Sequence, residues 1–425
     1  MKPFSFFSLL FFSAPFVFSQ NVPAESPRGI VKTGIDVLVE NHFDVLQGKR
    51  IGLITNPTGV TSRLESTVDV LAKANGVKLV ALFGPEHGVR GDAEAGASVE
   101  SYVDSATGLP VYSLYGRTRK PTPEMLKNID ALVYDIQDIG VRSYTFISTM
   151  AYGMEAAAEN NIEFIVLDRP DPLTGDKIEG NVLDTTFKSF VGMFPIPYVY
   201  GMTCGELATM INNEGWLVEN PFGEGGRKCK LFVVKMKGWK RSMWWDETGL
   251  PWVPTSPHIP NAQTALYYAA TGIAGELDAV NIGVGYTMPF QLFGTPWIEQ
   301  DKLAGALSEM NLPGLCFRPT TYVPFYGGMK GKQVHGVQIY FPDRDEVHLV
   351  ATQFYILQAL YHLYPGKDLF ALSSPGRLTM FDKVMGTDSV RRAVMNHVPV
   401  KEIIAGWESG IEKFLVKRKK YLLYE

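Results

Sequence analysis

Glu86 lies in the sequence GPEHG (residues 84–88), directly after an apolar run that is typical of a buried β-strand. The flanking glycines allow the backbone to approach a ligand closely, and the proline stiffens the turn. A carboxyl held in so constrained a turn can donate a proton to a leaving oxygen, as glycoside hydrolysis requires. The alternative is a turn carboxylate bonded only to backbone amides. We expect a catalytic acid at Glu86, with His87 either orienting it or a sugar hydroxyl, or simply bonded within the loop.

A second carboxylate is expected from the residues that follow the apolar run at 131–134. Asp135 and Asp138 both qualify as the nucleophile or the water-activating base of a glycosidase. Either aspartate can instead cap the helix that follows, a role that suits Asp138 well. Asp135 is the preferred candidate for catalysis, and Asp138 for binding substrate. The sequence gives no carboxylate separation, so retention and inversion of configuration both stay open.

Arginines close to the predicted strand ends could hold an anionic group of the substrate. Arg90, Arg142 and Arg169 are the candidates, because the guanidinium fork is the usual partner of a carboxylate. Each could instead pair with a neighbouring aspartate. Further polar candidates for substrate binding at or just after strand ends are Asn56, Tyr144 and Asp168.

The elements that must position these side chains form an alternating pattern. Short apolar runs alternate with segments of helical periodicity, which predicts an α/β fold: a Rossmann-like parallel sheet with helices on both faces. Polar residues after four of the expected strands then meet at the carboxyl edge, where open α/β sheets bind ligands. The expected strands are 51–55, 77–83, 111–114, 131–134 and 164–167, and the expected helices are 61–75 and 146–160.

The Rossmann-like domain is expected over residues 30–180. No GxGxxG follows its first strand and no GxxxxGK[ST] occurs, so neither a dinucleotide nor a nucleotide phosphate is expected as ligand. Of the seven histidines, only His87 falls at the predicted edge, and the three cysteines lack metal-ligand spacing. We therefore expect no metal and no cofactor.

Residues 181–425 are expected to form a smaller α+β C-terminal domain. The predicted helices are 204–214, 350–364 and 400–424, and the predicted strands are 230–234 and 334–341. The loop 239–260 carries four tryptophans, at 239, 244, 245 and 252. These rings either stack on a sugar or pack between the domains, and packing is the commoner role.

The bulk composition limits the partners. A net charge of −4 over 425 residues gives no reason to expect nucleic acid or an anionic membrane. Residues 1–19 read as a secretory signal peptide, with an apolar run from Phe4 to Phe18 and small residues before a cut after Ser19. An uncleaved anchor is the alternative, but the run is shorter than the ~20 residues that span a bilayer. We expect an exported protein, periplasmic or secreted, without an anchor; the oligomeric state stays unknown.

The chain resembles the bacterial exo-β-N-acetylmuramidases, from about residue 33 to its end. The resemblance implies two domains with a cleft between them, catalysis by Glu86, and release of N-acetylmuramic acid from non-reducing ends of peptidoglycan. A sugar-binding protein without turnover, or a glycosidase for another amino or acidic sugar, are the alternatives. The matching segments are GLITNPTG (52–59), FGPEHG (83–88), YDIQD (134–138), VRSY (141–144), LDRPDP (167–172), SP (256–257) and KYLLY (420–424).

One stretch departs from the family pattern. Where many members carry SEGRGTTRPFE, this chain has NIGVGYTMPFQ at 281–291. Two arginines and two acids are replaced, which weakens the case for an anionic sugar at that subsite. Asn281 and Tyr286 are expected to substitute with neutral hydrogen bonds.

Overall fold

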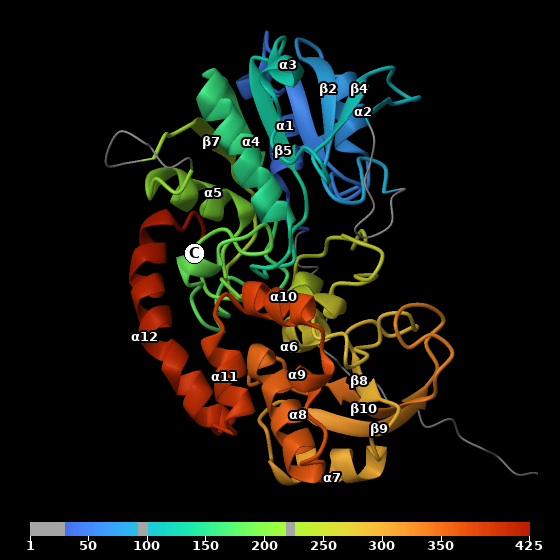
Figure 1. Ribbon diagram of the computed structural model, residues 1–425. Coiled ribbons are helices and arrows are strands. Elements are labelled where there is room, and N and C mark those ends of the chain that lie inside the picture. Colours follow the sequence, from blue (N-terminus) through green and yellow to red (C-terminus); the bar gives the residue numbers. More distant parts are fainter. Residues whose placement is uncertain (1–29, 92–100, 218–225) are drawn as a thin grey trace, which may run out of the picture.

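The computed structural model describes residues 30–91, 101–217 and 226–425 (Figure 1). The predicted signal peptide, residues 1–19, lies outside these ranges. A large sheet with its helices forms the upper half of the view, and a smaller sheet with the C-terminal helices forms the lower half. In the described ranges, no helix is both long and apolar enough to cross a membrane.

The larger sheet has seven strands in the order β3-β4-β2-β1-β5-β6-β7. All neighbours pair in parallel except β3 with β4. Without the short β3, the order is that of a Rossmann fold, with its switch point between β1 and β5. The strands are β1 (Arg50–Thr55), β2 (Lys78–Gly84), β3 (Tyr102–Val103), β4 (Pro110–Ser113), β5 (Ala131–Asp135), β6 (Glu163–Leu167) and β7 (Lys230–Val234).

Helices cover both faces of this sheet, which confirms the predicted fold class. Helices α1 (Gly34–Glu40) and α2 (Thr67–Ala72) pack on one face, and α4 (Phe146–Asn160) and α5 (Cys204–Asn213) on the other. The central strands are buried on both sides, as their unbroken apolar runs require. The short α3 (Pro123–Leu126) precedes β5, and single 3-10 turns occur at η1 (Asp44–Leu46) and η2 (Thr185–Phe187).

Two sequence expectations need correction. The helix expected over 61–75 is confined to Thr67–Ala72, because a backbone bridge between Val60 and Ser66 closes a loop there and Leu64 has a φ of 67°. Strand β7 was expected in the C-terminal domain, but it pairs with β6 as the edge strand of the large sheet. The short apolar run of β7 does not indicate which strand β7 pairs with, because that pairing depends on how α5 carries the chain from β6 to β7.

The lower half combines a three-stranded antiparallel sheet, in the order β8-β10-β9, with helices. Helices α7 and α8 pack against one another, and α8 also packs against α6. The elements are α6 (Gln263–Gly275), β8 (Leu292–Thr295), α7 (Gln300–Glu309), β9 (Cys316–Tyr322), β10 (Val334–Tyr340), α8 (Leu349–Leu363), α9 (Leu369–Leu372), α10 (Pro375–Met385), α11 (Ser389–Met395), α12 (Val400–Arg418), η3 (Trp245–Glu247) and η4 (Lys419–Tyr421).

The end of the chain returns to the large sheet, beside α5 in Figure 1. Arg418 donates to the carbonyls of Gly175 and Gly201, and the Tyr424 hydroxyl donates to Asp168. These bonds are largely buried, so the two halves of the molecule are joined by the last turn of α12 and the residues after it. The KYLLY segment (420–424), which matches the family pattern, therefore belongs to the contact between the two halves of the molecule.

Candidate active site

A cavity of about 700 Å³ lies between the two halves of the molecule. Its volume falls within the usual range of small-ligand sites. Of the residues predicted to act on substrate, Glu86, His87 and Tyr144 line it. Other lining residues are Tyr115, Arg119, Ser143, Thr145, Lys188, Phe190, Ser256, His258, Tyr268, Glu276, Phe290, Met380 and Lys383.

The turn after β2 places Glu86 at this cavity. His87 and Gly88 both adopt positive φ angles, 73° and 77°, so the chain reverses sharply at the strand end. A Cβ atom on Gly84 would lie 3.1 Å from the backbone nitrogen of Val89, which shows how tightly the turn closes. A non-glycine residue rarely adopts the conformation of His87 unless its surroundings enforce it. The turn therefore presents Glu86 in one fixed direction.

Two hydroxyl groups lie at the Glu86 carboxyl. Thr145 Oγ1 donates to Glu86 Oε2 over 2.9 Å, and the Tyr115 hydroxyl lies close enough for the Glu86 charge to affect its pKa. Burial, followed by the nearby Glu86 charge, raises the pKa of Tyr115 to about 12. Tyr115 thus stays protonated at neutral pH and remains a donor. The carboxyl is oriented by Thr145, with Tyr115 beside it, while its residue remains partly accessible.

A second carboxyl group, Glu276, enters the cavity from the end of α6. Burial raises the pKa of Glu276, and the Arg377 guanidinium, 3.7 Å away, opposes that rise. The pKa of Tyr268 is raised first by burial and then by the charges of Glu276 and Glu86. Tyr268 therefore lies within electrostatic range of both glutamates. Among the described residues that line the cavity, these two carry the carboxyl groups.

Three cations line the same cavity: Arg119, Lys188 and Lys383. The Arg119 guanidinium lies 4.3 Å from the ring centre of Phe190, which holds it by a cation–π contact. Within the described part of the chain, none of the three forms an ion pair closer than 4 Å. Each of them brings a positive charge to the wall of the cavity.

The predicted second carboxylate, Asp135, lies outside the cavity lining. It is fully buried, and its two oxygens accept bonds from Arg169 Nε and Nη2 at 2.6 and 2.9 Å. The Thr67 hydroxyl donates to the same carboxylate over 2.5 Å. Asp135 and Arg169 therefore form a buried ion pair with each other inside the N-terminal half.

The other predicted arginines are also engaged within the protein. Arg90 donates to both oxygens of Asp104, which is the pairing with an aspartate considered above. Arg142 is fully buried, and burial lowers its pKa to about 9. Its guanidinium donates to four main-chain carbonyls, those of Asn181, Ile196, Val384 and Met385.

The remaining polar residues predicted to bind substrate form hydrogen bonds or ring contacts within the protein. Asn56 accepts from the amide and hydroxyl of Thr58, and Asp138 accepts from Gly140 N and the Tyr200 hydroxyl. Asp168 accepts from Thr203, Gly205 and Tyr424. Asn281 bonds to the backbone of residues 283 and 284, and Tyr286 packs on the rings of Tyr322 and Phe325.

Some cavity residues went unpredicted. Tyr115 follows the short strand β4, so the strand-end rule that found Glu86 would also have found Tyr115. Glu276 and Lys383 lie at or near the ends of α6 and α10, where nothing in the local sequence distinguishes them from solvent-facing charges.

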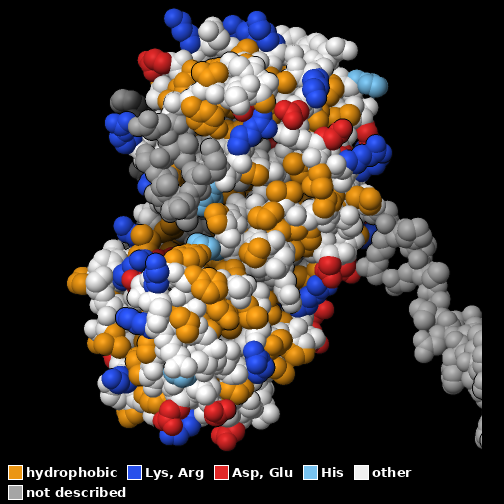
Figure 2. Space-filling view, turned by 90° about the vertical axis from the view of Figure 1, so that its right-hand side faces the viewer, with side chains coloured by type: hydrophobic (Ala, Val, Ile, Leu, Met, Phe, Trp, Pro, Cys, Tyr) orange, Lys and Arg blue, Asp and Glu red, His pale blue; other side chains and the backbone are white. Residues whose placement is uncertain are grey.

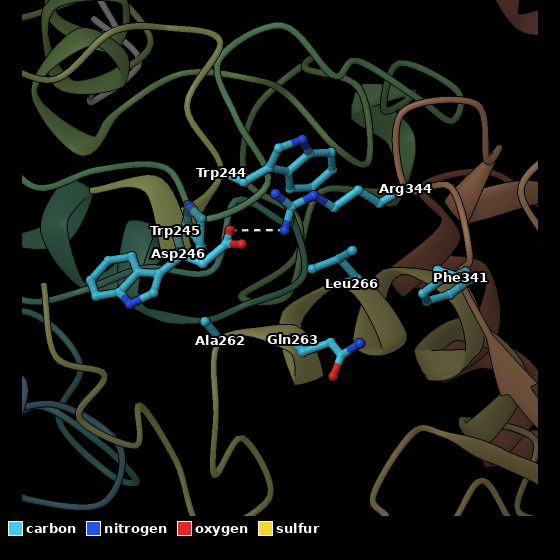
Figure 3. A pocket seen from close by; sticks show the side chains of 9 residues that line it. Trp244, Trp245, Asp246, Ala262, Gln263, Leu266, Phe341 and Arg344 are labelled. Carbon is cyan, nitrogen blue, oxygen red and sulfur yellow. Dashed lines mark hydrogen bonds and ion pairs between the residues drawn. The ribbon is translucent and has the colours of Figure 1, made fainter. Parts of the chain in front are cut away.

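The four tryptophans of the 239–260 loop do not line this cavity, although Ser256 and His258 of the same loop do. Trp245 packs edge-on against Trp252, and Trp239 against Tyr424. A separate pocket of about 290 Å³ adjoins Trp244 and Trp245 (Figure 3). There the Arg344 guanidinium covers the Trp244 ring at 4.7 Å and pairs with Asp246. Packing, rather than sugar stacking, accounts for these rings.

An α/β fold with two carboxyl groups and three cations around a cavity between its halves fits a carbohydrate-cleaving hydrolase. The chain belongs to the exo-beta-N-acetylmuramidase NamZ family. The N-terminal family model matches residues 51–263, and the C-terminal one matches residues 266–424. The resemblance noted in the sequence is thereby confirmed.

Known relatives cover nearly the whole chain. The peptidoglycan beta-N-acetylmuramidase NamZ of Bacillus subtilis (strain 168) is 47% identical over 408 residues, which are 96% of this chain and 94% of that protein. A crystal structure of a DUF1343 family protein from Bacteroides fragilis shares 52% identity with a TM-score of 0.88, covering 94% of this chain and all of that one. A second such protein from the same organism shares 31% identity with a TM-score of 0.73, covering 93% and 99%.

Proposed function

We propose that this protein is an exo-acting glycoside hydrolase that releases N-acetylmuramic acid from the non-reducing ends of peptidoglycan fragments. The observation that carries the proposal is the Glu86 carboxyl, bonded to Thr145 and lying near Tyr115 at the wall of the cavity. The expectation that Glu86 is the catalytic acid is kept. The relative from Bacillus subtilis, named for this activity, supports the choice of reaction.

Glu86 transfers the proton in this scheme. Its carboxyl donates a proton to the glycosidic oxygen as the bond to the anomeric carbon breaks, so the leaving chain departs as an alcohol. A water molecule supplies the hydroxyl that bonds to the anomeric carbon, and the proton that this water releases restores the acid. The Thr145 hydroxyl keeps the carboxyl pointing at the glycosidic oxygen. A proton donor positioned in this way needs no reorientation during the reaction.

Glu276 takes the place that the sequence suggested for Asp135. Because it reaches the cavity from the C-terminal half, the substrate lies between two carboxyl groups that belong to different halves of the molecule. In its ionised form, Glu276 stabilises the positive charge that develops on the sugar ring. Asp135 is unsuited to this role because both of its oxygens are bonded to buried partners.

Arg119, Lys188 and Lys383 recognise the lactyl carboxylate in the same scheme. N-acetylmuramic acid differs from N-acetylglucosamine by this acidic ether, so cations at the cavity wall favour the former. They replace Arg90, Arg142 and Arg169, whose guanidinium groups are bonded elsewhere in the fold.

The test compares disaccharides capped with N-acetylmuramic acid or with N-acetylglucosamine. We expect release from the first, and a loss of about 10²–10⁴-fold in Glu86→Gln. Lys383→Ala should erode the preference for the acidic cap while leaving slow release intact. Asp104→Asn, which changes a carboxylate bonded to Arg90, is the matched control. Binding without release would indicate a sugar-binding protein, and undiminished release by Glu86→Gln would contradict the assignment.

Export follows from the same proposal, because the glycan substrate lies outside the cytoplasm. The apolar segment at 4–18 supports a signal peptide that is cut after Ser19. The N-terminal sequence of the protein purified from its native cell should then begin at Gln20. A chain that retains Met1 and partitions with membranes would contradict this expectation.

A further inference from the structure

Two aromatic side chains are unusually exposed on the loop between β9 and β10. Phe325 is 59% exposed and Tyr326 is 47% exposed. Large apolar side chains that gather on a surface commonly mark a binding site, whereas single ones need no explanation. Tyr286, from the stretch that departs from the family pattern, adds a third ring at this place, 5.4 Å from Phe325.

The loop between β9 and β10 is held in place by contacts with Gly285 and Tyr286. Phe325 N donates to the Gly285 carbonyl over 2.6 Å, and Tyr286 is wedged between Phe325 and Tyr322. Gly285 has a φ of 89°, and a Cβ atom there would lie 2.4 Å from the Tyr326 carbonyl oxygen. The close approach of the two backbones requires glycine. The exposed rings of Phe325 and Tyr326 are therefore held in place by the packed segment at residues 285–286.

His258 connects these rings to the active-site cavity. It lines the cavity, its Nε2 lies 2.5 Å from the Tyr326 hydroxyl, and its ring stacks on Tyr326 with 5.9 Å between centroids. Burial lowers the pKa of His258, so the imidazole is neutral at physiological pH. We call His258, Tyr286, Phe325 and Tyr326 the aromatic rim. Figure 2 faces this side of the molecule, with histidine side chains (pale blue) at the hollow between the two halves.

The chemistry of the rim differs from that of the cavity. The cations that suit a carboxylate are at positions 119, 188 and 383, whereas the rim offers neutral rings with hydroxyl and imidazole groups at their edges. Amphipathic rings of this kind match a ligand with apolar faces and polar edges. Pyranose rings have that character, since their C–H faces are apolar and their hydroxyls lie at the periphery.

We propose that the aromatic rim binds the sugars of the leaving glycan chain beyond the first residue after the cleaved bond. This inference rests on the proposed function. An exo-acting enzyme encloses one terminal sugar, so the rest of the chain must leave the cavity across its edge. His258 belongs to the wall of the cavity, and Tyr326 and Phe325 continue outward from it.

The experiment measures kcat/KM for a disaccharide and for a hexasaccharide, both capped with N-acetylmuramic acid. Wild type should prefer the longer chain. Phe325→Ala should reduce kcat/KM for the hexasaccharide by about five- to tenfold through KM, with the disaccharide unchanged. Phe232→Ala is the matched control, because Phe232 is 47% exposed on the edge strand β7, far from the cavity lining. Thermal unfolding of each variant checks that the fold is kept.

Equal kinetics of Phe325→Ala and wild type on both substrates would overturn the proposal, as would an equal loss on both. A change from dimer to monomer in sedimentation, with unaltered kinetics, would also overturn it and assign the rim to a subunit contact. If wild type cleaves neither substrate, the proposed function fails instead. In that case, binding of uncapped N-acetylglucosamine-ended chains, measured by calorimetry for wild type and Phe325→Ala, still decides whether the rim holds glycan.

Discussion

Arg169 Nε lies 2.6 Å from Asp135 Oδ1, and both side chains are buried at the carboxyl end of β5. This is the switch point of the sheet, between β1 and β5, where Rossmann-like folds bind their ligands. In this protein the Asp135–Arg169 pair occupies the position where such a ligand would bind. The Thr67 hydroxyl and the Val60 carbonyl form hydrogen bonds with the pair there. The active-site cavity is displaced toward the ends of β2 and β4, which supply Glu86 and Tyr115.

The buried pair predicts an effect on stability. Asp135→Ala leaves the Arg169 guanidinium buried without its counter-charge, which should lower the free energy of unfolding by about 3–5 kcal/mol. Urea denaturation followed by circular dichroism measures it. Asp130→Ala, which breaks the solvent-exposed pair with Arg50, is the control and should cost far less. A loss in Asp135→Ala no larger than in the control would show that the pair contributes little.

The two cavity glutamates should respond differently to the leaving group. A nitrophenol leaving group needs little protonation, so Glu86→Gln should retain much of its rate on a nitrophenyl glycoside of N-acetylmuramic acid. Glu276→Gln should lose about 10²–10⁴-fold on both the nitrophenyl glycoside and the disaccharide, because the charge on the sugar ring develops in either case. Steady-state rates of the two variants on the two substrates provide the comparison. Glu276→Gln activity close to wild type would remove Glu276 from the reaction.

The strand-end argument predicted part of the site from the sequence. It correctly predicted the layered sheet and brought Glu86 and Tyr144 to one cavity, because parallel strands must end at a common edge. It could not distinguish a strand-end side chain that faces the cavity from one that faces the interior. Asp135 and Asp168 end their strands like Glu86, yet their partners Arg169 and Tyr424 lie 34 and 256 positions away.

Local sequence patterns could not predict the residues that line the cavity from the C-terminal half. Glu276 and Lys383 come from α6 and α10 in the C-terminal half, and they meet Glu86 only because the two halves pack together. Arg142 illustrates the same difficulty. Its four acceptors are main-chain carbonyls, for which no residue type in the sequence is a signal.

Arg142 should therefore act on the fold rather than on substrate choice. Arg142→Met leaves the buried carbonyls of Val384 and Met385 without a donor, at about 1–3 kcal/mol for each unsatisfied group, whereas the Ile196 carbonyl keeps the Leu183 amide. We expect a strongly lowered unfolding temperature with an unchanged preference between the two sugar caps at permissive temperature. Lys383→Ala should show the reverse pattern. Differential scanning calorimetry and competition between the two capped disaccharides measure both variants, and a selective loss of the acidic cap in Arg142→Met would return Arg142 to substrate binding.

Asp138 should make stability depend on pH. Burial raises its pKa to about 7 from an ordinary value of 3.8, although Gly140 N–H and the Tyr200 hydroxyl donate to it and oppose the rise. Between those two values the folded protein holds a proton that the unfolded chain has released. Stability therefore falls as pH rises from about 4 to 7 and then levels off, by an amount on the order of 4 kcal/mol for this group.

Asp138→Asn tests this because the amide keeps an oxygen acceptor for Gly140 and Tyr200 but cannot ionise. Burial also raises the pKa of Asp168 to about 6 and that of Asp171 well above its ordinary value, but both residues are present in both proteins. The difference in unfolding free energy between variant and wild type, measured in urea at a series of pH values, isolates Asp138. It should shift in favour of the variant from pH 4 to pH 7 and stay constant above. A difference that does not change with pH would mean that Asp138 keeps the same charge in the folded and unfolded chain.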